Sequence, residues 1–71
     1  MRDFDIPRSQ VEFLIDEWIF SERDRRILKR RLLDGVCFEP LAEEFNLSVR
    51  YVKTIVYKGE DKLFSKLNKM H

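Results

Sequence analysis

The chain has 71 residues, of which 44% are hydrophobic and 38% charged, so it has room for one domain and enough apolar content to fill a single core. Its one cysteine, Cys37, excludes an internal disulfide and fits a reducing compartment. No apolar run reaches the ~18 residues of a membrane span, and the N-terminus lacks the basic and then apolar pattern of a signal peptide. We therefore expect a cytoplasmic protein without a membrane partner.

The net charge of +1 is unevenly distributed along the chain. Residues 1–47 carry 8 Lys/Arg against 11 Asp/Glu, whereas residues 48–71 carry 6 against 2. Because a phosphate partner responds to the local field, the C-terminal third is the candidate for contact with nucleic acid. A second basic cluster spans Arg23–Arg31 and is either a further cationic face or a solvated helix face paired with Glu22 and Asp24.

The first helix is predicted at residues 10–19. Ser9 precedes this helix and Glu12 lies in its first turn, which is the spacing of a capping box. In a capping box each of the two side chains accepts a hydrogen bond from a free backbone amide at the helix start. The apolar residues that recur at helical spacing and are expected to face inward are Val11, Leu14, Ile15 and Trp18.

A second helix is predicted at residues 22–33. Ser21 and Asp24 repeat the capping spacing with a shorter acid, and Gly35 ends the helix because glycine readily adopts the left-handed conformation. Its inward residues are Ile27, Leu28 and Leu32.

A third, short helix is predicted at residues 38–45. Pro40 is tolerated in its first turn but disfavours helical geometry at the preceding Glu39, so we expect the helix to begin a residue or two late. Asn46 follows as a left-handed stop. The inward residues are Leu41, Ala42 and Phe45.

The fourth helix is predicted at residues 49–66, with Ser48 as its N-cap. Leu47 and Val52 have the spacing of a hydrophobic staple across that cap. Gly59 weakens the helix by about 1 kcal/mol relative to alanine. The apolar stripe nevertheless continues beyond it, which predicts one long or slightly bent helix.

The segment from Phe38 to Lys58 has the pattern of a helix-turn-helix. Ala42 is small where the two helices cross, Asn46 can turn left-handed four residues later, and Val52 supplies a branched apolar contact six residues beyond. An ordinary helical hairpin would explain any one of these residues alone. Together they predict an all-α, four-helix fold over residues 1–71, with a three-helix core, an N-terminal helix and a helix-turn-helix that binds DNA.

The step of about 100° per residue along a helix identifies the side of the fourth helix that faces away from Val52. We expect Arg50 and Thr54 to lie near base edges in the major groove, and Lys53 and Lys58 to bind phosphate. Tyr51 is expected to contact a thymine methyl group or a phosphate. The full predicted DNA-binding set is Arg50, Tyr51, Lys53, Thr54, Tyr57 and Lys58.

Three stretches of the chain carry a resemblance to a known family. Ser21–Leu28 opens a helix, Leu33–Gly35 closes it, and Ala42–Lys53 supplies the turn and the reading helix. The region from Ser21 to Leu67 resembles region four of bacterial RNA polymerase sigma factors of the sigma-seventy type, and the related LuxR-type DNA-binding domains. The resemblance implies a three- or four-helix fold with the helix after Ser48 in the major groove of a promoter-type element.

In that family, the positions matching Arg50, Tyr51, Lys53 and Thr54 face the groove. This chain departs from the family pattern at three positions. Asn46 replaces the usual glycine, Pro40 stands where an acid is common, and Ile55 occupies a place that is often basic, so we expect Ile55 to pack against the first two helices or a partner chain. Nothing in the chain resembles the sigma regions that melt promoters or grip core polymerase, so we expect a stand-alone bacterial regulator of transcription.

The alternative function is a protein-interaction module of the same fold, acting on RNA polymerase, another regulator or a second copy of itself. Four acids close to the reading helix favour it: Glu43, Glu44, Glu60 and Asp61. Leu63, Phe64 and Leu67 are either a seam for a homodimer or core residues packed against the first helix.

An enzyme is not expected. The only histidine, His71, is the last residue of the chain, so no Cys/His dyad or metal cluster can be drawn on a rigid element. No glycine-rich phosphate loop is present, and adjacent acids diverge by about 100° on a helix. We therefore expect neither a cofactor nor a metal.

Overall fold

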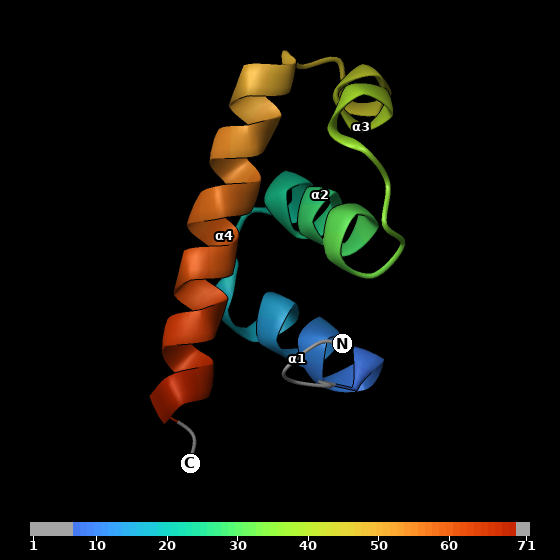
Figure 1. The fold of residues 1–71 in the computed structure, drawn as a ribbon. Coiled ribbons are helices and arrows are strands. Elements are labelled where there is room, and N and C mark those ends of the chain that lie inside the picture. Colours follow the sequence, from blue (N-terminus) through green and yellow to red (C-terminus); the bar gives the residue numbers. More distant parts are fainter. Residues whose placement is uncertain (1–6, 70–71) are drawn as a thin grey trace, which may run out of the picture.

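The structure, a computed structural model, describes residues 7–69, with the side chains of residues 7–66. Over these residues it contains four α-helices and no strand, which confirms the predicted all-α, four-helix architecture. The helices are α1 (Arg8–Trp18), α2 (Glu22–Leu32), α3 (Phe38–Phe45) and α4 (Val49–Lys69) (Figure 1).

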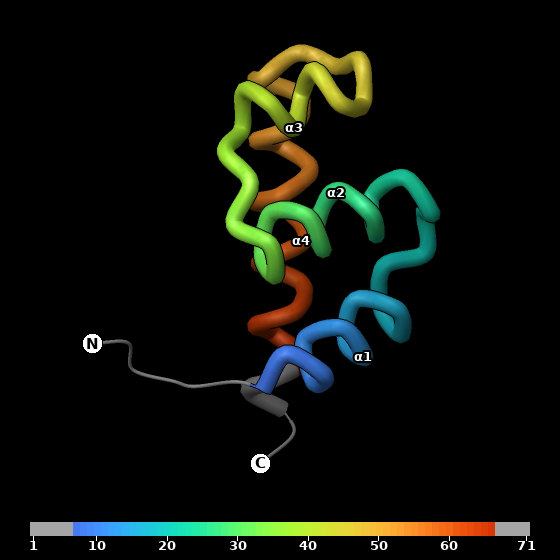
Figure 2. The backbone as a smooth tube through the Cα atoms, turned by 90° about the vertical axis from the view of Figure 1, so that its right-hand side faces the viewer, coloured from blue at the N-terminus to red at the C-terminus, as the bar shows by residue number. Residues whose placement is uncertain are grey.

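The long helix α4 is the spine of the molecule, and the other three helices are stacked along it. Figures 1 and 2 show α3 beside the N-terminal end of α4, α2 beside its middle and α1 beside its C-terminal half. All three contact α4, and α2 also contacts α1 and α3. The three shorter helices therefore lie along the same side of α4, with α3 and α2 against its N-terminal half, and the opposite side is left uncovered.

The first helix begins earlier than predicted. It starts at Arg8, and the carbonyl of Pro7 accepts hydrogen bonds from the amides of Gln10 and Val11 at 3.0 and 3.1 Å. Ser9 thus lies inside the helix, and the N-cap makes no side-chain hydrogen bond, so the predicted capping box is wrong. The reason is that Pro7 is itself the N-cap residue, and its carbonyl accepts the amide of Gln10, which a capping side chain would otherwise have satisfied.

The two serine caps that precede α2 and α4 are confirmed. Ser21 Oγ accepts from the amide of Asp24 at 3.4 Å, and Ser48 Oγ accepts from the amide of Tyr51 at 3.1 Å. Gly35 after α2 has a φ of 72°, in the predicted left-handed region.

The third helix occupies the predicted residues, but its start is not delayed. It begins at Phe38, with Pro40 as its third residue, where the missing amide hydrogen has no intrahelical acceptor in any case. Asn46 ends it in the predicted left-handed conformation, with φ 59° and ψ 43°.

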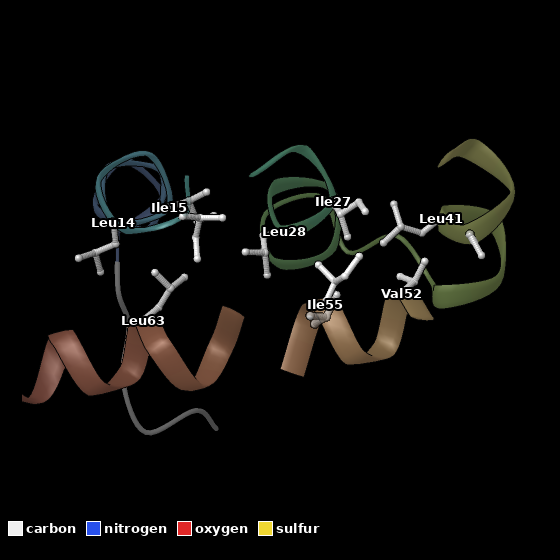
Figure 3. Close-up of a cluster of buried hydrophobic side chains, with 11 residues drawn as sticks. Leu14, Ile15, Ile27, Leu28, Leu41, Val52, Ile55 and Leu63 are labelled. Carbon is white, nitrogen blue, oxygen red and sulfur yellow. The ribbon is translucent and has the colours of Figure 1, made fainter. Parts of the chain in front are cut away.

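The core is formed by apolar residues of all four helices and follows α4 from Val52 to Leu63 (Figure 3). Val52 and Val56 of α4 are fully buried, as are Ile27 of α2 and Leu41 of α3. Ile55 is also in the core, at 8% exposure, so of the two placements expected for it the structure shows packing within the fold and not on a partner chain. The buried residues are Leu14, Ile15, Ile19, Ile27, Leu28, Leu41, Ala42, Val52, Ile55, Val56 and Leu63.

The C-terminal half of α4 continues without interruption through Gly59 to Lys69. Gly59 is buried against Leu28 of α2, so it lies where the two helices approach each other closely. Leu63 is a core residue at 4% exposure and not part of a free seam. The side chain of Leu67, the third residue of the predicted dimer seam, lies outside the described residues.

Candidate nucleic-acid interface

The turn between α3 and α4 sets the position of the candidate reading helix. Residues 46–48 connect the two helices, and the amide of Leu47 donates to the carbonyl of Ala42 at 2.9 Å. Ala42 is 3% exposed and Val52 is fully buried, so both residues predicted to hold the helix pair together lie in the core. The N-terminal half of α4 is therefore fixed by buried contacts on one side only.

The opposite side of α4 carries the predicted contact residues. Arg50 and Thr54 point away from Val52 and Val56, as the helical step requires, and both are exposed. None of the six is buried, so the structure leaves every one of them accessible to a partner. They are Arg50, Tyr51, Lys53, Thr54, Tyr57 and Lys58.

The centre of this face combines a free cation with a fixed hydroxyl. The side chain of Arg50 makes no hydrogen bond or ion pair with any residue that the structure describes, and the same holds for Lys58. Thr54 Oγ1 donates to the carbonyl of Arg50 at 3.1 Å, which leaves its lone pairs able to accept. The face thus offers a guanidinium for base or phosphate acceptors beside an acceptor for base amino groups.

One flank of the face is organised by a residue from another helix. Arg23 Nη2 donates to the hydroxyl of Tyr51 at 3.1 Å, and the guanidinium carbon lies 5.3 Å from the centre of the Tyr51 ring. Arg23 Nε also donates to Asp24 at 3.3 Å. The Tyr51 hydrogen bond, followed by the Asp24 contact, raises the pKa of Arg23 above its usual value. Tyr51 therefore has a tertiary partner that links α4 to α2.

The other flank is organised by Phe38 at the start of α3. The ring of Tyr57 meets Phe38 edge to face, with centroids 6.1 Å apart, and Lys53 Nζ lies 5.6 Å from the Phe38 centroid. Arg31 covers the same ring at 4.4 Å. Contacts with Phe38 of α3 thus position both Lys53 and Tyr57 of α4. The quadrupole of the Phe38 ring attracts the ammonium group of Lys53.

The second basic cluster, Arg23–Arg31, serves mainly to join the helices. Arg25 donates to the carbonyls of Asp16 and Ile19 at the end of α1, and Arg31 donates to the carbonyl of Val36 at 3.0 Å. Its predicted pairing with Glu22 and Asp24 is seen only for Arg23 and Asp24.

Arg30 of the same cluster links α2 to α3. Its Nη2 donates to Glu44 at 2.9 Å, and this contact, reinforced by Asp34, raises the pKa of Arg30. Most of the cluster is therefore engaged within the fold, and Arg23 is the member that reaches α4.

Two contacts in this interface were not foreseen from the sequence. Arg23 lies 28 residues from Tyr51, and Phe38 lies 19 residues from Tyr57, so neither pair shares a helix. Only the basic character of Arg23 and the aromatic character of Phe38 were visible as signals. No helical periodicity connects them to α4.

Within the part of the chain that the structure describes, no group of three or more His, Cys, Asp or Glu side chains is arranged to hold a metal ion. His71 lies outside the described residues. None of the described helices is long and apolar enough to cross a membrane. Comparisons with protein-family models, with curated proteins and with solved structures found no match.

Proposed function

We propose that this protein binds double-stranded DNA in a sequence-specific manner, with the N-terminal half of α4 in the major groove, and acts as a small regulator of transcription. The observation that supports this most is the exposed face of α4, where Arg50 and Thr54 lie opposite the buried Val52 and Val56. The major groove of B-DNA admits one helix whose outer side chains reach base edges. A helix whose one side is packed in the core and whose other side is exposed meets that requirement.

The residues on this face divide between base contact and phosphate contact. Arg50 is unpaired among the described residues and is near the start of α4, where reading helices touch base edges. A guanidinium can bond O6 and N7 of guanine at once, which gives discrimination of about 1–3 kcal/mol. Lys53 and Lys58 flank Arg50 at about 60° and 80° around the helix, in opposite directions, where the two phosphate strands of a groove would lie.

Two further partners belong to this proposal. One helix-turn-helix reads few base pairs, so a second copy of the chain would extend the footprint through two-fold symmetry. The resemblance to sigma region four also makes RNA polymerase a candidate partner at a promoter-type element. Sedimentation of the DNA complex, with and without polymerase, distinguishes one copy from two and detects a ternary complex.

Selection from a random duplex library tests the proposed readout. Repeated rounds of binding to the full chain should enrich one short motif, and the affinity for it should fall with salt by about 0.9 log units per log unit of salt for each phosphate contacted. A pool that stays random after enrichment, or binding that does not respond to salt, would contradict sequence-specific DNA binding.

The second candidate is a protein-interaction module without direct DNA readout. Asp61 favours it, because it is exposed and lies on the same side of α4 as Arg50 and Thr54, two to three turns further along. A carboxylate there would repel a phosphate backbone that followed the whole helix. This candidate predicts binding to polymerase by a chain that has no measurable affinity for duplex DNA.

A further inference from the structure

A groove of about 290 Å³ lies between the α1–α2 connection and α4, next to the face described above. Tyr51, Thr54 and Lys58 belong both to that face and to the wall of the groove. The remaining side chains that matter here are Trp18, Phe20, Arg23, Asp24 and Lys62. We call this feature the basic groove.

We propose that the basic groove binds the sugar-phosphate backbone of the same DNA duplex, where one strand leaves the major-groove contact. The inference rests on the proposed DNA-binding function and assigns Arg23 and Lys62 to the interface in addition to the six predicted residues. Continuity supports it: a strand that passes Tyr51 and Lys58 at the edge of the reading helix reaches the groove directly.

The charge of the basic groove fits a phosphate strand. Arg23, Lys58 and Lys62 contribute three positive charges, and Asp24 contributes the one negative charge among the lining residues. That carboxylate is already engaged by Arg23 Nε at 3.3 Å. Lys58 and Lys62 are one helical turn apart, so their ammonium groups follow the same side of α4 with a rise of about 6 Å between them. The groove therefore presents a line of cations and not a single point charge.

The Arg23–Tyr51 contact prepares two donors for phosphate oxygens. Arg23 donates one hydrogen bond to Asp24 and one to Tyr51, and its other guanidinium N–H groups remain able to donate to a further acceptor. Because the Tyr51 oxygen accepts from a cation, its own O–H is left to donate outward and is strengthened as a donor. Phosphate oxygens accept both kinds of hydrogen bond, and such charge-assisted bonds are the strong ones.

Phe20 explains how Lys62 is held at the rim. Phe20 is 74% exposed, and Lys62 Nζ lies 5.3 Å from the centroid of its ring. A cation placed over an aromatic face loses rotamer freedom before a ligand arrives, so less entropy is lost on binding. Lys62 is thus positioned over Phe20 at the rim of the groove, with its side chain still exposed to solvent.

Salt titration of three chains on the selected duplex tests the inference. The chains are the wild type, Lys62→Ala, and Lys29→Ala as the matched control, because Lys29 pairs with Asp16 on the α1 side and is not a groove residue. Lys62→Ala should reduce the slope of log affinity against log salt by about 0.9 and weaken specific and random duplexes by the same factor. Lys29→Ala should leave slope and affinity unchanged. Lys62→Gln serves as a second variant, with melting temperatures recorded for all chains.

Neutral phosphates locate the contact on the DNA. Single phosphates of the selected duplex are replaced with neutral methylphosphonates. At one position the replacement should weaken binding of the wild type but leave the affinity of Lys62→Ala unchanged, because that variant already lacks the contact. A wild type that binds no duplex would overturn the proposed function and this inference together. A wild type that binds, with Lys62→Ala and Lys62→Gln retaining its full slope, would overturn the groove assignment alone. So would a polyglutamate peptide that binds the wild type but not Lys62→Ala while DNA binding stays equal, because that result assigns the groove to an acidic protein.

Discussion

Leu28 of α2 and Gly59 of α4 are in contact so close that no side chain fits between them. A Cβ built on Gly59 would lie 2.6 Å from Leu28 Cδ1 and 2.8 Å from Cδ2. Leu28 is 1% exposed and has little room to move away. The glycine that weakens α4 as an isolated helix therefore permits α2 and α4 to pack closely in the fold.

This relationship predicts that Gly59→Ala destabilises the protein. Overpacking costs about 1–3 kcal/mol and the better helix propensity of alanine returns about 1 kcal/mol, so we expect a net loss of up to about 2 kcal/mol in the free energy of unfolding. Urea denaturation measures it. In a double-mutant cycle, Leu28→Ala should relieve the clash, so the two losses should not add. Stabilisation by the full propensity gain would show that the contact is looser than described.

The N-cap of α4 predicts a local stability effect at the N-terminal end of the helix. Ser48→Ala removes the acceptor for the amide of Tyr51 and should lower the free energy of unfolding by about 1 kcal/mol. Ser65→Ala is the matched control, since Ser65 is an exposed residue inside the same helix. Equal stability of the two variants in thermal melts would mean that Ser48 contributes nothing as a cap.

The Arg23–Tyr51 hydrogen bond predicts coupled effects on DNA affinity. Tyr51→Phe and Arg23→Ala should each weaken binding to the selected duplex, and the double variant should lose less than the sum because the two side chains act as one donor pair. Tyr51→Phe should change stability by less than about 0.5 kcal/mol, since the residue is exposed. If the two losses of affinity add fully, Arg23 and Tyr51 contact DNA independently and do not act as one donor pair.

The ion pairs of Asp34 with Arg8 and Arg30 predict that the stability of the fold depends on pH in the acidic range. Hydrogen bonds from Arg8, and then from Arg30, lower the pKa of Asp34 below its ordinary value of 3.8. A carboxylate with a lowered pKa in the folded state stabilises the fold above pH 3.8, and this contribution is lost as the pH falls through the folded value. Asp34→Asn should lower the melting temperature at pH 6 and converge with the wild type near pH 2. A constant difference across that range would exclude the ion pairs as the cause.

Local signals in the sequence predicted the boundaries of the helices better than their contacts. Ser21, Ser48 and Asn46 act within a few residues of themselves, so their spacing was sufficient to predict two caps and the left-handed turn. Ser9 failed because a competing local signal, Pro7, starts the first helix two residues earlier. Both outcomes were decided by backbone conformation over one turn.

The contacts that organise the candidate interface are tertiary and were not predictable from periodicity. Arg23 reaches Tyr51 across two helices, and Phe38 reaches Tyr57 across the turn. The sequence showed that Gly59 lowers the helix propensity of α4, but not that it permits close packing against Leu28 of another helix. The exposed side of α4 followed from its buried side, whereas the partners that fix each exposed residue required the three-dimensional arrangement.

The most direct measurement is the affinity of Arg50→Ala/Lys53→Ala for the selected duplex, beside the control Arg8→Ala/Lys29→Ala. Both double variants lose two positive charges, but Arg8 and Lys29 pair with Asp34 and Asp16 away from the exposed face of α4. We expect the first variant to lose specific binding while its melting temperature stays close to that of the wild type, and the control to bind as the wild type does at equal ionic strength. Undiminished specific binding by Arg50→Ala/Lys53→Ala would contradict the assignment of α4 as the reading helix.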